Sequence, residues 1–308
     1  MVIRIEHLFH DHAGERALRD FNVQIGEGDL FGIIGADGAG KSTLFRILAT
    51  LLQPQQGLVQ ILGMDPVLQR KNIRQKIGYM PQRFSLYQDL TVLENLHFAA
   101  DVMEVRSQEK KDRIEALMRF SRLGSAHARK AGQLSGGMKQ KLALCCALVR
   151  KPSLLILDEP TVGVDPVTRK DFWDMLAELR RDGTTILVST PYMDEAEQCS
   201  QVLLLHEGFS LDQGSPAGLC SRLPGKLWKI HGNSSLHVDS DCKIANSLLD
   251  LYTMGGDLHA IAAMGTEPAD ILSEVQKIAP DAQYIDPVAP RVEDVFLHDL
   301  RSRRSSHV

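Results

Sequence analysis

Continuous apolar runs alternate with amphipathic stretches along much of the chain. The segments LFGII (30–34), LLILDEP (154–160) and TTILVST (184–190) contain runs typical of strands that are buried on both faces. Residues after the first run recur at the i, i+3, i+4, i+7 spacing of one helix face, namely Leu44, Ile47, Leu48 and Leu51. A second apolar stripe separates the other two runs and consists of Phe172, Met175, Leu176 and Leu179. This strand–helix–strand order predicts a largely parallel sheet with both faces covered.

The stretches around these runs have different patterns. Short extended pieces with crude alternation, VIRIEHL and ALRDFNVQI, precede the first run, and GLVQILG and KIGYMP lie within residues 57–81. Residues 91–133 are polar and helical in pattern, with acidic and basic side chains interleaved. We therefore expect a helical subdomain inserted into the sheet domain, over about residues 88–150.

The pattern changes again from about Ser215 and Pro216. Two short strands and one helix are indicated by the segments KLWKIHG, HAIAAMG and ILSEVQKIA, and the chain closes with VEDVFLHDL and RSRRSSHV. These features predict a small α+β accessory domain at 221–308 after a larger domain at 1–220, with a frayed, solvated tail.

Composition limits the possible functions. A chain of 308 residues that is 44% hydrophobic can bury a sizeable core, which excludes a wholly disordered protein. The net charge of −4 gives no general attraction to polyanions, and 6% aromatic residues are too few for broad base stacking, so we expect no nucleic-acid partner. The five scattered cysteines lack CxxC spacing, which argues against a disulfide framework or a zinc site and favours a reducing cytoplasm.

The apolar segments also bear on location. The start, MVIRIEHLFHDH, lacks the apolar run of a signal peptide. No segment approaches the roughly 20 apolar residues that a membrane span needs. We therefore expect a chain that is soluble on its own.

The clearest chemical motif lies between the first buried strand and the helix after it. GADGAGKS matches GxxxxGK[ST], a loop whose backbone N–H groups surround a phosphate chain at a helix N-terminus. Lys41 supplies a cation to the β- and γ-phosphates, and Ser42 offers a hydroxyl to Mg²⁺. Asp37 is an unusual acid in such a loop, and we expect it to point outward. The nucleotide-binding residues expected here are Gly35, Ala36, Asp37, Gly38, Ala39, Gly40, Lys41, Ser42 and Thr43.

Two acidic residues follow the second apolar run. Asp158 stands at the strand end, where its carboxylate can hold Mg²⁺ through water, and Glu159 can polarise an attacking water. Alone, this pair followed by a proline is more often a strand-end turn. Downstream of a phosphate loop, it favours nucleotide hydrolysis.

A third motif indicates a family. LSGGMKQ (134–140) is similar to the LSGGQ signature of ATP-binding cassette (ABC) ATPases, and it opens a predicted helix. The resemblance implies that Ser135, Gly136 and Gly137 bind ATP through its γ-phosphate. Gln82 in YMPQ resembles the Q-loop glutamine, a Mg²⁺ ligand that also senses the transmembrane partner, and GVD at 163–165 looks like the D-loop.

These motifs occur in the family's order between residues 35 and 191. The resemblance implies an α/β fold: a P-loop NTPase core of ABC type with an N-terminal antiparallel β subdomain, a helical subdomain and a small C-terminal α+β appendage. It also implies an ATPase that uses ATP and Mg²⁺. The implied catalytic residues are Glu159, Gln82 and Lys41, and the implied metal ligands are Ser42, Gln82 and Asp158.

Two departures from the family pattern affect the mechanism. The family carries a switch histidine after the third core strand, but STPYMDEAE places Pro191 there, with neither an imidazole nor a backbone donor. Either a neighbour compensates or the hydrolytic site is weakened; we favour weakening, since only Thr190 and Tyr192 offer donors nearby. His12 stands at the position of the adenine-stacking aromatic residue, and is either that residue or a surface histidine in a loop.

The segments YMPQRFSLYQDLTVLENL, STPYMDEAE and VEDVFLHDL resemble cassettes of multidrug, lipid and polysaccharide exporters. The resemblance thus implies an exporter's ATP-binding subunit, peripheral on the cytoplasmic face of the inner or plasma membrane. It implies two partners: a second cassette, packed head to tail as a homo- or heterodimer, and integral membrane permease subunits that contact Gln82 and residues 83–95. Two alternatives stay open, a catalytically weak regulatory half that supports an active cassette, and a non-transport ABC ATPase acting on ribosomes or DNA.

Overall fold

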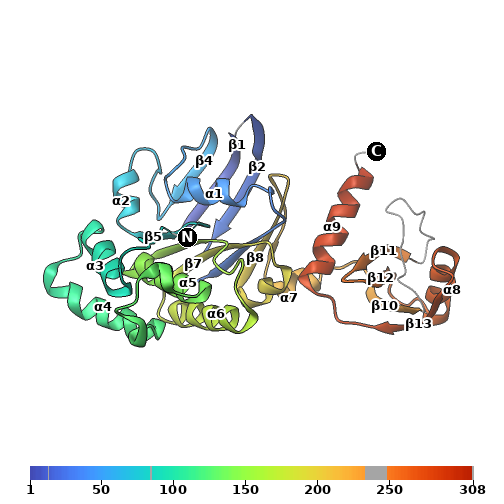
Figure 1. Cartoon of the computed structure of the whole chain (residues 1–308). Helices are drawn as coiled ribbons and strands as arrows, with labels where there is room; N and C mark the ends of the chain where they lie inside the picture. Colours follow the sequence, from blue (N-terminus) through green and yellow to red (C-terminus); the bar gives the residue numbers. More distant parts are fainter. Residues whose placement is uncertain (13, 84, 233–247, 307–308) are drawn as a thin grey trace. The chain divides into compact units, whose positions relative to one another are not determined.

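The chain folds into two compact units. The computed structural model describes residues 1–12, 14–83, 85–232 and 248–306, whose course is drawn in Figure 1. The units are Met1–Ser215 and Pro216–Val308. The sequence predicts the division five residues later, after residue 220. The difference arises because helix α7 (Pro216–Cys220) packs against α9 (Val292–Ser306), which makes it part of the second unit.

A six-stranded sheet forms the centre of the first unit. Its order is β5-β6-β7-β3-β8-β9, in which the first five strands run parallel and β9 pairs antiparallel with β8. The strands are β3 (Leu30–Ile34), β5 (Ile77–Met80), β6 (Leu154–Asp158), β7 (Thr185–Thr190), β8 (Gln201–His206) and β9 (Phe209–Gly214). Every residue of β3, β6 and β7 is buried, which confirms the strands predicted from the apolar runs.

A second sheet of three antiparallel strands belongs to the same unit. Its order is β2-β1-β4, with β1 (Ile3–His12), β2 (Glu15–Ile25) and β4 (Gln56–Ile61). Helix α1 (Lys41–Leu48) contacts both β2 and β6, so it packs between the two sheets. Alternate side chains of the six-stranded sheet join α1 and the second sheet in one apolar core, among them Phe31, Phe45, Ile156 and Leu187. The expected antiparallel β subdomain is therefore confirmed.

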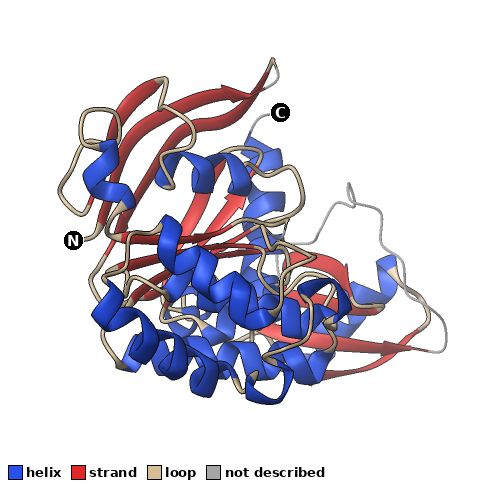
Figure 2. Cartoon of the chain, turned by 60° about the vertical axis from the view of Figure 1, so that its left-hand side comes forward, coloured by secondary structure: helices blue, strands red, loops and turns tan. Residues whose placement is uncertain are grey.

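Helices cover the face of the six-stranded sheet that lies opposite α1 (Figure 2). Helix α5 contacts β5, and α6 contacts β3 and β7. The helices of this layer are α3 (Val92–Val102), α4 (Ser107–Ser121), α5 (Gly136–Leu148) and α6 (Pro166–Arg181), with 3-10 turns η1 (Gly124–Ala126), η2 (Ala131–Gln133) and η3 (Met193–Gln198). Helix α2 (Arg70–Arg74) instead contributes Ile73 to the core shared with α1. A capping box between Thr91 and Glu94 begins α3. Helices α3, α4 and α5 fall within the range expected for the helical subdomain.

The second unit is an α+β domain, as the sequence predicts. Its four antiparallel strands have the order β11-β12-β10-β13, with β10 (Lys226–Gly232), β11 (Leu248–Met254), β12 (Asp257–Ala262) and β13 (Ala282–Pro287). Ile271 and Val275 of α8 (Pro268–Ile278) pack against one face of this sheet. The expectation of a frayed tail is wrong for the backbone of residues 301–306, because α9 continues to Ser306. Arg301 donates to the buried carboxylate of Asp250, whereas Ser302 and Arg303 are exposed as expected.

Candidate functional site

The glycine-rich loop joins β3 to α1 in a conformation that requires glycine. Gly40 has a φ of 107°, and a Cβ atom there would lie 2.3 Å from the carbonyl oxygen of Ala17. A Cβ at Gly35 would lie 2.3 Å from the carbonyl oxygen of Leu205. The loop therefore fits closely against the neighbouring backbone, and only glycine allows this approach. The side chain of Asp37 is 91% exposed, and its Oδ1 lies 3.9 Å from Nζ of Lys41, so the acid is solvated but still faces the loop cation.

Lys41 opens α1 with a buried side chain, of which only 3% is exposed. Its ammonium donates to the carbonyl oxygens of Gly35 (2.8 Å) and Ala36 (3.0 Å). It also forms an ion pair with Glu159, with 3.0 Å between Nζ and Oε1. The loop cation and the proposed general base are thus in direct contact.

The end of β6 carries the two acidic residues. Ser42 Oγ donates to Asp158 Oδ1 at 3.2 Å, which joins the loop hydroxyl to the strand-end carboxylate. Burial raises the pKa of Asp158, and hydrogen bonds from Ser189 and Ser42 limit that rise. Two oxygen groups of the kind that Mg²⁺ prefers therefore lie side by side.

Glu159 adopts a left-handed backbone conformation, with a φ of 50°. This region disfavours residues other than glycine, by roughly 1–2 kcal/mol. The backbone N–H of Glu159 donates to Ser189 Oγ at 2.9 Å, and that hydroxyl donates to Asp158 Oδ1 at 2.7 Å. Ser189 is completely buried. One hydroxyl on β7 therefore holds both Asp158 and Glu159, a role that no sequence motif indicates.

Gln82 joins the site from the end of β5. Its amide nitrogen donates to Glu159 Oε2 at 2.7 Å, so the carboxylate of Glu159 is held between Gln82 and Lys41. An open pocket of about 320 Å³ lies over these groups and is lined by Glu15, Arg16, Ala17, Asp37, Gly38, Gly40, Lys41, Ser42, Thr43, Gln82 and Glu159. The structure thus brings together most of the phosphate-loop residues with Glu159 and Gln82, and Asp158 lies beside Ser42.

The donor set fits a triphosphate with Mg²⁺. The pocket lies at a helix N-terminus beside a buried cation, which favours an anion. Ser42 and Asp158 offer adjacent oxygens for a divalent cation. Gln82, the third expected ligand, bonds to Glu159 rather than to either of them.

The signature residues lie outside this pocket. Ser135 caps α5 by accepting a hydrogen bond from the backbone N–H of Met138 (3.4 Å), and both Ser135 and Gly136 are exposed. Gly137 is buried, and a Cβ atom there would lie 2.0 Å from Cγ2 of Thr168 in α6. The backbone N–H of Thr168 also donates to Asp165, the D-loop residue that caps α6. Thr168 therefore packs against the signature and bonds to the D-loop.

The segment around Pro191 holds its hydrogen-bonding groups away from the pocket. Thr190 Oγ1 donates to Glu195 Oε2 at 2.5 Å and accepts from the backbone N–H of Tyr192 at 3.0 Å. The ring of Tyr192 stacks on the guanidinium of Arg169, 4.3 Å from the ring centroid. The Thr190 hydroxyl is therefore already engaged, and neither Thr190 nor Tyr192 lines the pocket.

The position expected for the adenine-stacking residue falls at the edge of the described residues. His12 ends β1, and its side chain lies outside the described part of the chain. The described lining on this side comes from Glu15, Arg16 and Ala17 of β2. The guanidinium of Arg16 lies 5.7 Å from the ring centroid of Phe9. No motif in the sequence indicates Arg16, because its place depends on the pairing of β1 with β2.

The sequence is similar to known transport proteins. A family profile described as "ABC transporter" matches residues 18–162. "Probable multidrug ABC transporter ATP-binding protein YbhF" of Escherichia coli K12 is 40% identical over 290 residues, which cover 91% of this chain and 48% of YbhF. The chain thus spans about half the length of this relative. "Nod factor export ATP-binding protein I" of Rhizobium etli is 32% identical over 90% of this chain and 86% of that protein.

Solved structures agree with these relatives. The ATP-binding cassette MJ0796, in a dimeric post-hydrolysis state bound to ADP and Pi, matches with a TM-score of 0.63 and 27% identity over 69% of this chain and 98% of that chain. Among the described residues, none of the helices has both the length and the apolar composition needed to cross a membrane. Because this chain matches 86% of the Rhizobium etli protein at 32% identity, it belongs to the ABC transporter family of ATP-binding proteins.

Proposed function

We propose that this chain binds and hydrolyses ATP to power an exporter through separate membrane subunits. The observation that carries the proposal is the convergence of Lys41, Gln82 and Glu159 at one pocket, beside the Ser42–Asp158 pair. The export direction is supported by the relatives, whose names refer to multidrug transport and Nod factor export.

Each residue of the site has a role in this mechanism. The loop N–H groups, the N-terminus of α1 and Lys41 bind the phosphate chain of ATP. Ser42, Asp158 and Gln82 would hold Mg²⁺, which would supply positive charge to neutralise the phosphates. Glu159 orients the attacking water and accepts its proton. As Lys41 binds phosphate, its ion pair with Glu159 weakens and the carboxylate becomes available for the water.

A second cassette completes the site in this proposal. Ser135 and Gly136 are exposed at the N-terminus of α5, where backbone N–H groups favour an anion. These residues lie outside their own chain's pocket, so they would serve the phosphates bound to a partner cassette packed head to tail. The dimeric state of the related cassette MJ0796 supports this arrangement.

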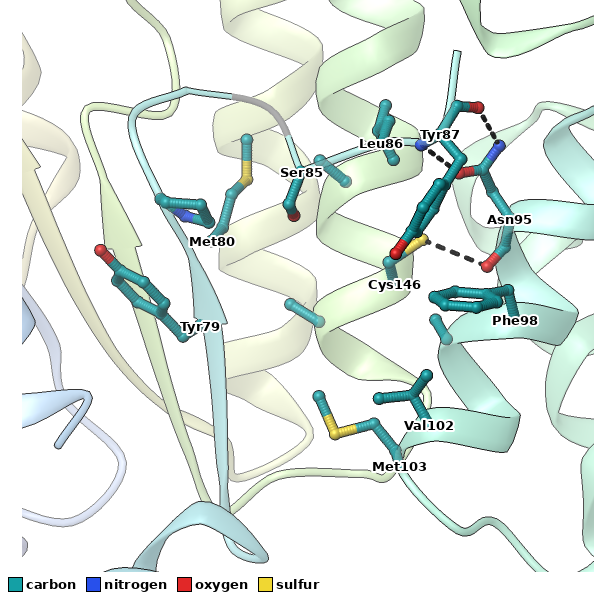
Figure 3. Close-up of a pocket in the computed structure, with 14 residues that line it drawn as sticks. Tyr79, Met80, Ser85, Leu86, Tyr87, Asn95, Phe98, Val102, Met103 and Cys146 are labelled. Carbon is teal, nitrogen blue, oxygen red and sulfur yellow. Dashed lines mark hydrogen bonds between the residues drawn. The ribbon is translucent and has the colours of Figure 1, made fainter. Parts of the chain in front are cut away.

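The membrane subunits would dock beside Gln82. A groove of about 250 Å³ lies between β5, α3 and α5 (Figure 3). Tyr87 and Phe98, 51% and 40% exposed, meet edge to face with ring centroids 4.5 Å apart. The amide of Asn95 bonds to both backbone groups of Tyr87, which fixes the loop that follows Gln82. A segment of the membrane subunit seated here would press on that loop. The chain would then lie on the cytoplasmic face of the inner or plasma membrane.

The ATP site of this chain is weakened in our proposal. Pro191 replaces the switch histidine, the Thr190 hydroxyl donates to Glu195, and neither Thr190 nor Tyr192 lines the pocket. A homodimer would then have two slow sites. A heterodimer with a histidine-bearing cassette would keep one complete site, to which this chain contributes its signature. The presence of Pro191 in place of the switch histidine also favours the second candidate function, a regulatory cassette that supports an active partner.

A test uses the tagged chain purified with the membrane proteins that accompany it. We expect ATP-dependent phosphate release that disappears in Glu159→Gln and persists in Glu115→Gln, a matched change at an exposed position of α4. Phosphate release that survives Glu159→Gln would contradict the proposed base. If a homodimer of this chain releases phosphate without the slow rate expected of two weakened sites, the regulatory role is contradicted. Co-purification with ribosomes in place of membrane proteins would contradict transport.

A further inference from the structure

The carboxylate of Glu195 is buried and has no part in the mechanism described above. It lies in η3 (Met193–Gln198), within the segment STPYMDEAE, and only 2% of the residue is exposed. A buried carboxylate is retained at a substantial desolvation cost unless hydrogen bonds and charges compensate it. Its contacts therefore indicate what it holds in place.

Glu195 accepts hydrogen bonds from two completely buried hydroxyls. Thr161 Oγ1 donates to Oε1 at 2.7 Å, and Thr190 Oγ1 donates to Oε2 at 2.5 Å. A threonine hydroxyl has a single proton, so both hydroxyls are committed to this carboxylate. Arg169 of α6 faces it from a third side, with 3.6 Å between Nε and Oε1.

These partners come from the two segments that define the hydrolytic site. Thr161 stands two residues after Glu159 and two residues before the D-loop at 163–165. Thr190 stands between Ser189, which holds Asp158 and Glu159, and Pro191. The two strand ends are therefore joined twice, once through Ser189 and once through Glu195.

The strained backbone of Glu159 makes the second link important. Its left-handed φ of 50° persists only where the surroundings fix it. The Ser189 hydroxyl fixes the N–H side of Glu159, whereas Thr161 and Glu195 fix the chain that follows it. Loss of either link would let Glu159 relax away from the position in which it meets Lys41 and Gln82.

We propose that Glu195 is a positioning residue that ties the segment after Glu159 to the segment that carries Pro191. This inference rests on the proposed ATPase function. None of the three residues that face Glu195 lines the nucleotide pocket. Loss of the link therefore lowers kcat and leaves nucleotide affinity nearly unchanged, since a displacement of about 1 Å at a catalytic group can reduce a rate by up to roughly a hundredfold.

The experiment compares Thr161→Val, which keeps the shape and removes the hydroxyl, with Thr161→Ser, which keeps the hydroxyl. Glu195→Gln is measured beside Glu197→Gln, a matched change at an exposed position of η3. Phosphate release is assayed in the complex with partner subunits, and binding of a fluorescent ATP analogue is assayed in parallel. We expect Thr161→Val and Glu195→Gln to lose on the order of tenfold to a hundredfold in kcat. KM for ATP should stay within about twofold, and Thr161→Ser and Glu197→Gln should resemble the wild type.

The outcomes separate this inference from the proposed function. If the wild-type complex releases no phosphate, the proposed function fails. If the wild-type complex releases phosphate and Thr161→Val keeps the wild-type kcat, the positioning role alone is overturned. An equal loss in Thr161→Ser and Thr161→Val would also overturn it, because the hydroxyl would then not be the relevant group. If Glu195→Gln does not fold, the Thr161 pair still decides.

Discussion

The ammonium of Lys41 lies 3.0 Å from Oε1 of Glu159, so the cation of the phosphate loop and the proposed general base form a buried ion pair. Lys41→Ala should weaken ATP binding for two reasons. It removes the buried cation that faces the phosphates, a contact of about 1.5–3 kcal/mol. It also leaves the carboxylate of Glu159 without its counter-charge beside an incoming polyanion.

This prediction is checked by titration of a fluorescent ATP analogue. The expected loss of affinity is roughly tenfold to a hundredfold. Lys170→Ala, at an exposed position of α6, should bind like the wild type. Equal binding by Lys41→Ala and the wild type would show that the phosphates bind elsewhere.

Glu159→Gln should separate binding from hydrolysis. The amide keeps the shape of the side chain but cannot accept a proton from water, so turnover should be lost. ATP should bind at least as tightly as in the wild type, because Lys41 no longer has a carboxylate competing with the phosphates. Closed dimers should therefore accumulate with ATP and Mg²⁺, which light scattering after size exclusion measures. A dimer fraction equal to that of the wild type would contradict this view.

Ser189→Ala should slow hydrolysis without removing any group that touches nucleotide. The variant leaves Asp158 without one of its two hydroxyl donors, and leaves the N–H of Glu159 without its acceptor. A hydrogen bond to a charged group contributes about 1.5–3 kcal/mol, so kcat should fall on the order of tenfold or more. Steady-state phosphate release gives the rate, with Ser125→Ala as an exposed control. An unchanged kcat would show that Glu159 keeps its conformation without this hydroxyl.

The phosphate loop could be predicted from sequence because its chemistry is local. Gly40 and Lys41 are specified by adjacent residues and by the strand and helix that flank them. Ser189 and Glu195 were not predictable, because their partners, Glu159 and Thr161, are 30 and 34 positions away in the sequence. Neither contact has a residue pattern of its own, since each arises from the pairing of β6 with β7.

The helical C-terminus was missed for the same reason. The segment from Arg301 onward has the composition of a solvated tail. Arg301 is nevertheless anchored, because Asp250 lies 51 positions earlier on β11 and is brought to α9 by the fold. The charges within this segment alone could not distinguish a solvated tail from an anchored helix.

Asp294 should make the second unit sensitive to acid. Burial alone would raise its pKa, but hydrogen bonds from His259, the Arg291 N–H and Tyr252 outweigh it, and the net pKa lies below its usual value. A carboxylate with a lowered folded pKa stabilises the fold above the unfolded pKa of about 3.9. That contribution is lost as the pH falls through the folded pKa.

The measurement is urea unfolding across pH in a Trp173→Phe background, where the buried Trp228 reports on the second unit. Asp294→Asn should lower the free energy of unfolding by about 1–3 kcal/mol at pH 7. The difference from the parent should shrink below about pH 4. A difference that stays constant across this range would mean that ionisation of Asp294 contributes nothing to stability.

Pro191→His should restore part of the hydrolytic rate. In this family the switch residue serves the site built on its own phosphate loop. Here the Thr190 hydroxyl donates to Glu195, and neither Thr190 nor Tyr192 lines the pocket. Loss of one preorganised donor at a transition state typically lowers the rate about 10²–10³-fold. The wild-type chain without a partner cassette should therefore turn over slowly, and Pro191→His should be faster.

The matched control for that change is Pro191→Ala, which frees the backbone from the proline ring but supplies no imidazole. If the imidazole matters, Pro191→His gains rate and Pro191→Ala does not. The gain should also depend on Thr190, whose hydrogen bond to Glu195 fixes the direction of the residue that follows it. The assay is steady-state phosphate release from each purified chain, with and without its partner cassette. Brisk turnover by the wild type alone, unaffected by Pro191→His, would mean that Glu159 and Gln82 position the water without a switch residue.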